Sequence, residues 1–142
     1  MEVITFYINN IPFGTDIKIV DGISKRLDIV EDTQCDTFIL GSVMYRNELI
    51  RVIDLSNYLF GTPTKYNENS KIMVCIINKI KVAFILDNIS NIININDEEI
   101  IINDGFIKNH CYMIDGYIKL KDNTLLGILN IETIIKELFM YN

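Results

Sequence analysis

Short apolar segments separated by turn-forming residues run along most of this chain. β-Branched and aromatic residues dominate these segments, and at the end of 89–96 isoleucine alternates with asparagine over 93–96. Both patterns are typical of β-strands. Besides residues 38–55, the segments expected to form strands are 3–8, 11–13, 27–30, 72–77, 80–86, 89–96, 100–102, 112–120 and 124–129. Strands at this short, regular spacing predict a mainly all-β protein, built as a sandwich or as small barrels.

The stretch 38–55, FILGSVMYRNELIRVIDL, is expected to fold as strand, turn and strand. Gly41 allows a tight approach of the backbone, and the polar residues 46–48 form the turn. The apolar run that follows returns as a strand up to Asp54. Arg46 is therefore presented at a turn, where it is the most interesting polar residue of the chain. The alternative explanation is a simple pairing with a nearby carboxylate.

Two segments have the features of helices. Residues 56–60 are expected to form a short helix that ends at Gly61. The tail 130–141 places its apolar residues at helical spacing, and Asn130 can cap its first turn. The polar loop 62–70, TPTKYNENS, is the best candidate for an internal boundary.

Residues 16–23, DIKIVDGI, are open to two interpretations. Apolar positions three and four residues apart are weakly helical, whereas β-branching and Gly22 favour an extended segment with a kink. Val20 and Ile23 belong to this segment. Apolar residues of this kind lie more often in a core than on a binding surface, so the pattern alone leaves their role open.

Composition and charge narrow the classes of function. The chain has 142 residues, 49% of them hydrophobic, which is enough for one globular domain. A net charge of −6 argues against nucleic acid and anionic membranes as partners, because both require a basic surface. No apolar run approaches the roughly 20 residues of a membrane helix, and no signal peptide is evident. Three widely spaced cysteines indicate free thiols in a cytoplasmic protein.

The sequence contains no constellation typical of catalysis, a metal or a cofactor. His110 and Cys111 are adjacent, but zinc requires more ligands, and neighbours on a strand point to opposite faces. The acidic run 97–99 lacks the spacing and glycine of a calcium loop. Asp54 and Asp87 both follow apolar segments and are expected to act as structural turn caps. We therefore predict no catalytic residue, no metal site and no cofactor.

Several segments match the pattern of a known family. The run GSVMYRNELIRVIDL places Gly41, Arg46, Asp54 and Leu55 at the spacing of G-V-x-N-L-R-G-x-I-x-P-x-x-D-L, without a gap. The segments FGTDIKIVDGI, VAFILDNISNIININDEEI and DGYIKLKDNTLLGILNIETII match earlier and later motifs of the same family. Over nearly its whole length, the chain thus resembles CheW, the coupling protein of bacterial chemotaxis.

The chain also departs from the family pattern. Gly22 replaces a glutamate, Met44 an asparagine and Asn47 a glycine, and family prolines are replaced as well. These changes affect expected binding surfaces more than the apolar framework. We therefore expect a divergent member, whose fold carries over better than its binding surfaces do.

The resemblance implies a non-catalytic protein with two five-stranded barrels similar to Src-homology-3 barrels and a C-terminal helix. The barrels would form one domain over residues 1–142, with the internal boundary near 62–70. The implied partners are the regulatory domain of a CheA histidine kinase and the cytoplasmic tip of a chemoreceptor. By matching position, Val20 and Ile23 would line the receptor groove, and Arg46 would lie beside it.

Two alternatives stay open at the level of sequence. A CheW-like scaffold that has lost receptor binding could serve another signalling assembly, and the departures at Gly22, Met44 and Asn47 motivate this hypothesis. A thiol-dependent enzyme would use Cys111 or Cys35 as its nucleophile. Such an enzyme would also need a nearby base that activates the thiol.

Overall fold

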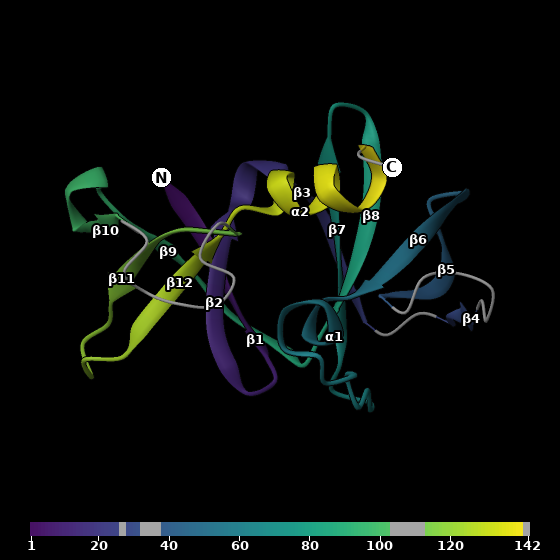
Figure 1. The fold of residues 1–142 in the computed structure, drawn as a ribbon, viewed down its shortest axis with the longest axis horizontal. Helices are drawn as coiled ribbons and strands as arrows, with labels where there is room; N and C mark the ends of the chain where they lie inside the picture. The colour runs from purple at the N-terminus through teal and green to yellow at the C-terminus, as the bar shows by residue number, and fades with distance from the viewer. Residues whose placement is uncertain (26–27, 32–37, 103–112, 141–142) are drawn as a thin grey trace. The chain divides into compact units, whose positions relative to one another are not determined.

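The computed structural model describes residues 1–25, 28–31, 38–102 and 113–140, and within these ranges the chain forms twelve strands and little helix (Figure 1). The prediction of a mainly β fold is confirmed. The twelve described strands belong to two six-stranded sheets. The predicted candidates for thiol or metal chemistry, Cys35, His110 and Cys111, lie outside the described residues.

The chain divides into two units that interleave along the sequence. Unit 1 contains residues 1–6, 12–17 and 90–142, and unit 2 contains residues 7–11 and 18–89. The loop 62–70, where we expected an internal boundary, lies inside unit 2, because the elements on both sides of it belong to one sheet.

Unit 2 is built on a sheet with the strand order β3-β7-β8-β6-β5-β4. Its strands are β3 (Val20–Lys25), β4 (Val30–Glu31), β5 (Ile39–Tyr45), β6 (Glu48–Asp54), β7 (Lys71–Ile77) and β8 (Ile80–Leu86). The hairpins β5–β6 and β7–β8 are joined by a parallel pairing of β6 with β8, in which Val52 lies opposite Ala83. The core of the unit contains Val43, Tyr45, Ile50, Val52, Ile72, Val74, Ala83 and Ile85.

Each hairpin of unit 2 turns through two residues with positive φ. These residues are Arg46 (48°) and Asn47 (65°) between β5 and β6, and Asn78 (50°) and Lys79 (68°) between β7 and β8. Two-residue turns of this kind match the twist of the flanking strands. The predicted strand, turn and strand, with an arginine at the turn, is confirmed.

Unit 1 is built on a sheet with the strand order β10-β11-β12-β2-β1-β9. Its strands are β1 (Glu2–Ile8), β2 (Ile11–Asp16), β9 (Asn88–Asn94), β10 (Ile100–Ile102), β11 (Ile114–Lys119) and β12 (Leu125–Leu129). The hairpins β1–β2 and β11–β12 are joined by a parallel pairing of β12 with β2, in which Gly127 lies opposite Phe13. Its core contains Val3, Ile95, Ile118, Leu126 and Ile128.

Both units follow one strand scheme, although their chain order differs. Read from matching edges, the sheets are β3-β7-β8-β6-β5-β4 and β9-β1-β2-β12-β11-β10. A helix follows the equivalent strand in each unit: α1 (Leu55–Phe60) follows β6, and α2 (Ile131–Ile135) follows β12. In unit 2 the hairpin β7–β8 follows the helix in the sequence. The equivalent hairpin of unit 1, β1–β2, comes from the beginning of the chain.

A glycine in each sheet lets a short edge strand approach closely. A Cβ atom on Gly41 in β5 would lie 1.9 Å from the carbonyl oxygen of Val30 in β4. A Cβ atom on Gly116 in β11 would lie 2.7 Å from the carbonyl oxygen of Ile101 in β10. The tight approach predicted at Gly41 is therefore present. The short strands β4 and β10 bring each described sheet to six strands, where the resemblance implied five.

Two segments each combine two kinds of backbone structure. The segment expected to be either weakly helical or kinked forms a 3₁₀ turn, η1 (Ile17–Ile19), followed directly by β3. The apolar tail begins as α2 and continues as a π-helical turn over Lys136–Met140. Its predicted cap is confirmed, because Asn130 accepts a hydrogen bond from the N–H of Thr133 at 2.9 Å.

Asp54 fixes both the start of α1 and the loop that follows this helix. Its side chain is buried and accepts a hydrogen bond from the N–H of Asn57 at 3.2 Å. It also accepts hydrogen bonds from the N–H and the hydroxyl of Thr64, at 2.9 and 2.6 Å. The helix then ends at Gly61, which has a φ of 70°. One carboxylate therefore connects the helix to its following loop.

We expect Asp54→Ala to lower the free energy of unfolding by about 2–4 kcal/mol, because it removes a cap and leaves buried donors unpaired. Asn130→Ala is the matched control, since it removes the cap of α2 and is expected to cost only about 1 kcal/mol. Urea unfolding of both variants measures the difference. Equal losses in the two variants would contradict the role of Asp54 in the loop.

Candidate functional site

The three residues predicted to bind a partner all lie in unit 2. Val20 and Ile23 belong to β3, an edge strand of the sheet, and Arg46 belongs to the β5–β6 turn. Val20 is half-buried, whereas the side chain of Ile23 is 42% exposed. Ile23 therefore offers more apolar surface to a partner than Val20 does. The residue that connects Arg46 to this strand is Asp21.

Asp21 occupies a β-bulge in β3. Val20 lies opposite Cys75 and Gly22 lies opposite Val74, so Asp21 is an extra residue without an opposite residue in β7. Bulges of this kind change the direction of a side chain. The Oδ2 atom of Asp21 lies 3.4 Å from Nη1 of Arg46, and the two side chains are 26% and 66% exposed. The bulge thus places a carboxylate beside the arginine.

Tyr45 fills the space above Gly22. A Cβ atom on Gly22 would lie 2.1 Å from the hydroxyl oxygen of Tyr45. The tyrosine is only 6% exposed and belongs to the core of unit 2, so its ring has little room to move aside. The family pattern has glutamate and leucine at these two positions. The two departures are therefore in contact, because the hydroxyl of Tyr45 occupies the space that a side chain at position 22 would fill.

The electrostatics of this cluster depend on its burial. The guanidinium carbon of Arg46 lies 5.0 Å from the centroid of the Tyr45 ring, within the range of a cation–π interaction. Burial raises the pKa of Tyr45; the charge of Arg46 opposes this shift, and the nearby carboxylate of Asp21 adds to it. The hydroxyl of Tyr45 is therefore a neutral hydrogen-bond donor at physiological pH.

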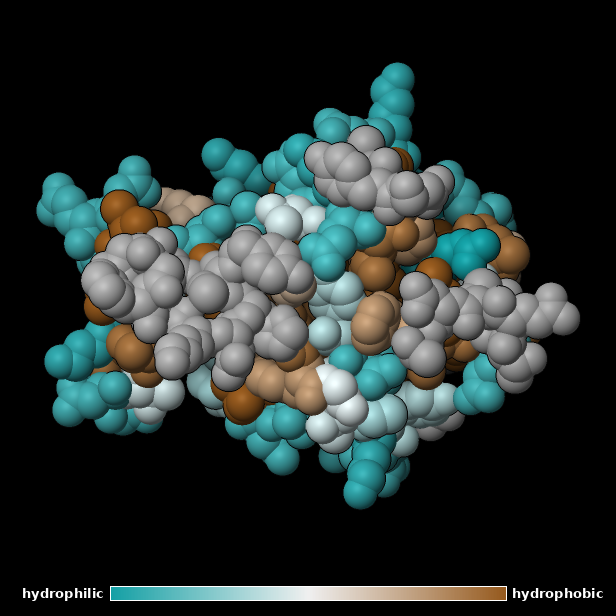
Figure 2. Space-filling model, viewed as in Figure 1, coloured by the Kyte–Doolittle hydropathy of each residue, from teal (hydrophilic) through white to brown (hydrophobic). Residues whose placement is uncertain are grey.

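A second surface of unit 2 is apolar. Met44 and Leu49 lie opposite each other in the β5–β6 hairpin, and Val30 of β4 lies opposite Ser42. The exposures of Val30, Met44 and Leu49 are 68%, 59% and 68%. Because cross-strand partners point to the same face of a sheet, these three side chains form one surface, which we call the apolar row. Figure 2 shows apolar surface over the end of this hairpin.

Asp87 holds the turn between β1 and β2. Its N–H donates to the carbonyl oxygen of Tyr7 at 3.0 Å, and its Oδ2 accepts from the N–H of Asn10 at 2.9 Å. Asp54 accepts backbone N–H groups in the same way. The carboxylates of both aspartates therefore bind N–H groups of nearby turns or loops.

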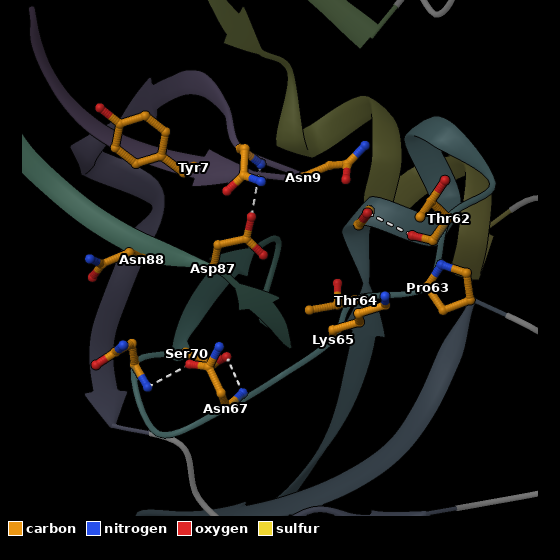
Figure 3. A pocket seen from close by; sticks show the side chains of 13 residues that line it. Tyr7, Asn9, Thr62, Pro63, Thr64, Lys65, Asn67, Ser70, Asp87 and Asn88 are labelled. Carbon is orange, nitrogen blue, oxygen red and sulfur yellow. Dashed lines mark hydrogen bonds between the residues drawn. The ribbon is translucent and has the colours of Figure 1, made fainter.

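A polar pocket of about 730 Å³ opens in unit 2 beside the β1–β2 turn, α1 and the loop after α1 (Figure 3). Much of its polar lining is engaged internally. The hydroxyl of Ser56 donates to the carbonyl oxygen of Thr62 at 2.6 Å, and the hydroxyl of Ser70 accepts from the N–H of Asn67 at 2.9 Å. The lining contains no histidine or cysteine. These hydrogen bonds stabilise the loop, and the pocket presents no catalytic pair.

The described residues show no arrangement for metal or thiol chemistry. They contain no group of three histidine, cysteine, aspartate or glutamate side chains that could hold a metal ion. Cys75 is fully buried, and burial raises the pKa of its thiol to about 12. A thiolate nucleophile does not form there near neutral pH. Within the same described part of the chain, no helix is long and apolar enough to cross a membrane.

Sequence reasoning identified Arg46 but missed the residues that surround it. Gly22 and the residue at position 45 differ from the family pattern together, and this double difference was the available signal for the Tyr45–Gly22 contact. The bulge at Asp21 has no comparable signal, because a one-residue shift in register does not alter the apolar pattern enough to be read. The apolar row was also missed, since its members come from three strands.

Comparisons with known proteins agree with this fold. A model of the CheW-like domain family matches residues 2–139. The chain is similar to the crystal structure of scaffolding protein TtCheW from Thermoanaerobacter tengcongensis, with a TM-score of 0.82 and 22% sequence identity, over 92% of this chain and 84% of that chain. The fold with two barrels similar to Src-homology-3 barrels is therefore confirmed. A search of curated proteins gave no match.

We expect Gly22→Ala to lower the free energy of unfolding by about 1–3 kcal/mol, because the new methyl group overlaps the hydroxyl of Tyr45. Adding Tyr45→Leu should restore a substantial part of this loss, since the two sites are in contact. Gly127→Ala is the matched control in a strand, because its Cβ atom would meet Phe13 at an ordinary 3.4 Å. Urea unfolding without any rescue by Tyr45→Leu would show that the two positions are not coupled.

Proposed function

Because this chain belongs to the CheW-like domain family, we propose that it is a non-catalytic cytoplasmic adaptor that couples chemoreceptor tips to the regulatory domain of a CheA-type histidine kinase. The observation that carries this proposal is the apolar row of unit 2, which leaves three large apolar side chains exposed on one sheet face. An adaptor works by placing its partners, and such a surface is suited to a protein interface.

The receptor side of the proposed adaptor is β3 with the adjoining turn. Ile23 and the exposed part of Val20 supply apolar contacts for a helical receptor tip. Arg46 supplies a planar group with several donors that can bind a carboxylate or backbone carbonyls at the rim. Its 66% exposure leaves the guanidinium accessible to such a partner.

The kinase side is proposed to be the apolar row. Val30, Met44 and Leu49 are distinct from the receptor residues, so both partners can be bound at once. Exposed aliphatic and methionine side chains contribute to binding when a partner removes them from water. The acidic net charge of −6 would then influence the choice of partner and the salt dependence more than the affinity.

A second candidate function is a CheW-like scaffold that has lost receptor binding and serves another assembly. The observation in its favour is the altered cluster, in which Tyr45 covers Gly22 and Asp21 already engages Arg46. Affinity capture with this chain discriminates the two functions, because such a scaffold would recover a kinase but never a receptor. A thiol-dependent enzyme receives no support from Cys75, whose thiol is buried and protonated.

We expect the chain to bind the regulatory domain of a CheA-type kinase from the same cell with micromolar or tighter affinity in calorimetric titration. The variant with both Met44→Ser and Leu49→Asn should bind at least tenfold more weakly, because it removes two apolar contacts. Ile92→Asn is the matched control, since Ile92 is 53% exposed on β9 in unit 1. No binding between two folded proteins would refute the kinase role.

We expect Arg46→Ala to fold normally, because an exposed ion pair contributes less than about 1 kcal/mol. The variant should nevertheless weaken the receptor-dependent activation or inhibition of the kinase, measured as the phosphorylation rate in reconstituted receptor membranes. Lys65→Ala, in the exposed loop after α1, controls for loss of positive charge. If Arg46→Ala leaves the receptor-dependent rate unchanged, Arg46 is not part of the receptor site.

A further inference from the structure

Asp21 lies next to two groups that can each use its carboxylate. One is the guanidinium of Arg46, whose Nη1 lies 3.4 Å from Oδ2. The other is the hydroxyl of Tyr45, which packs against Gly22, the residue next to Asp21, and whose pKa the carboxylate of Asp21 raises. Proximity to both groups follows from the bulge, which places Asp21 outside the regular pairing of β3 with β7.

The contact between Asp21 and Arg46 is weak, so another group can replace it. At 3.4 Å it is longer than a strong charge-assisted hydrogen bond, which measures about 2.7–2.9 Å. The arginine side chain is 66% exposed, so water screens the pair and can replace either partner. A carboxylate arriving from outside can therefore compete with Asp21 for the guanidinium.

The hydroxyl of Tyr45 lacks a hydrogen-bond acceptor, which the carboxylate of Asp21 can provide. Its oxygen is buried and finds no hydrogen-bond partner among the described residues. A buried donor without a partner is destabilising and needs an explanation. Asp21 raises the pKa of this hydroxyl, but no hydrogen bond joins the two side chains in this structure.

We propose that Asp21 is a specificity-determining residue that exchanges partners when the site is occupied. An acidic side chain of the receptor tip binds Arg46, and Asp21 turns to accept the hydrogen bond of the Tyr45 hydroxyl. The new hydrogen bond offsets the loss of the Asp21–Arg46 contact. This exchange rests on the proposed receptor role of Arg46, and it favours a partner with a carboxylate at that point over one with a neutral side chain.

The exchange is testable without any partner. Arg46→Ala frees Asp21, so Tyr45 should become a hydrogen-bond donor, and the ¹³Cζ resonance of selectively labelled Tyr45 should move. The double variant Arg46→Ala with Asp21→Ala controls for the loss of the cation–π contact, and its Tyr45 resonance should stay near that of Asp21→Ala alone. An unchanged resonance in Arg46→Ala, or an equal shift in the double variant, would overturn the exchange.

The second test measures binding to a helical hairpin from the cytoplasmic tip of a chemoreceptor of the same cell. Tyr45→Phe removes the alternative partner of Asp21 and is expected to weaken binding about two- to fivefold. The same variant should unfold at higher urea concentration, because it removes an unpaired buried hydroxyl. A purely structural role would change affinity and stability in the same direction, so unchanged or tighter binding by Tyr45→Phe would overturn the proposal.

A double-mutant cycle completes this test. Asp21→Ala should bind the hairpin about two- to fivefold more tightly, because the incoming carboxylate no longer competes with a charge. In that background Tyr45→Phe should have little further effect, and an undiminished effect would contradict the exchange. If the unmodified protein does not bind the hairpin, the proposed receptor role fails. The resonance of Tyr45 in Arg46→Ala then still decides whether Asp21 exchanges partners.

Discussion

Each unit of this fold depends on one parallel strand pair that joins two hairpins. In unit 2 the pair is β6 with β8, and in unit 1 it is β12 with β2. Hairpins are local structures, and an isolated one is barely stable in water. The parallel pair brings two of them into one sheet, and it is at these pairs that the apolar faces of the hairpins combine into a core. In unit 2 the helix α1 is part of the connection from β6 to β8, whereas in unit 1 the helix α2 follows β12 after the pair is complete.

Much of this framework could be predicted from local sequence. The hairpins are encoded by turn residues that tolerate positive φ, such as Asn9 with Asn10 and Asn78 with Lys79, between runs of β-branched residues. The tail helix is encoded by its apolar spacing and by the capping side chain of Asn130. The local signals alone were compatible with either a sandwich or barrels. The resemblance to the family pattern then predicted the fold with two barrels.

The candidate site was harder to predict, for reasons that are physical. Arg46 was found because a turn residue can be recognised from its neighbours in the sequence. Asp21, Gly22 and Tyr45 come together only because β3 pairs with β7 through a bulge and the β5–β6 hairpin brings Tyr45 over Gly22. Such contacts depend on strand pairing over long distances in the sequence, and no local pattern records them.

The interleaving of the units has a consequence for the order in which the chain folds. Val52 and Ala83, which pair in unit 2, are separated by a short stretch of chain, whereas Gly127 and Phe13 in unit 1 are separated by most of its length. Closing the longer loop costs more entropy and is slower. During synthesis, unit 2 has all of its strands once β8 is made, while β1 and β2 must wait for β12. The β1–β2 hairpin therefore stays without its parallel partner during the synthesis of all of unit 2 and until β12 has been made.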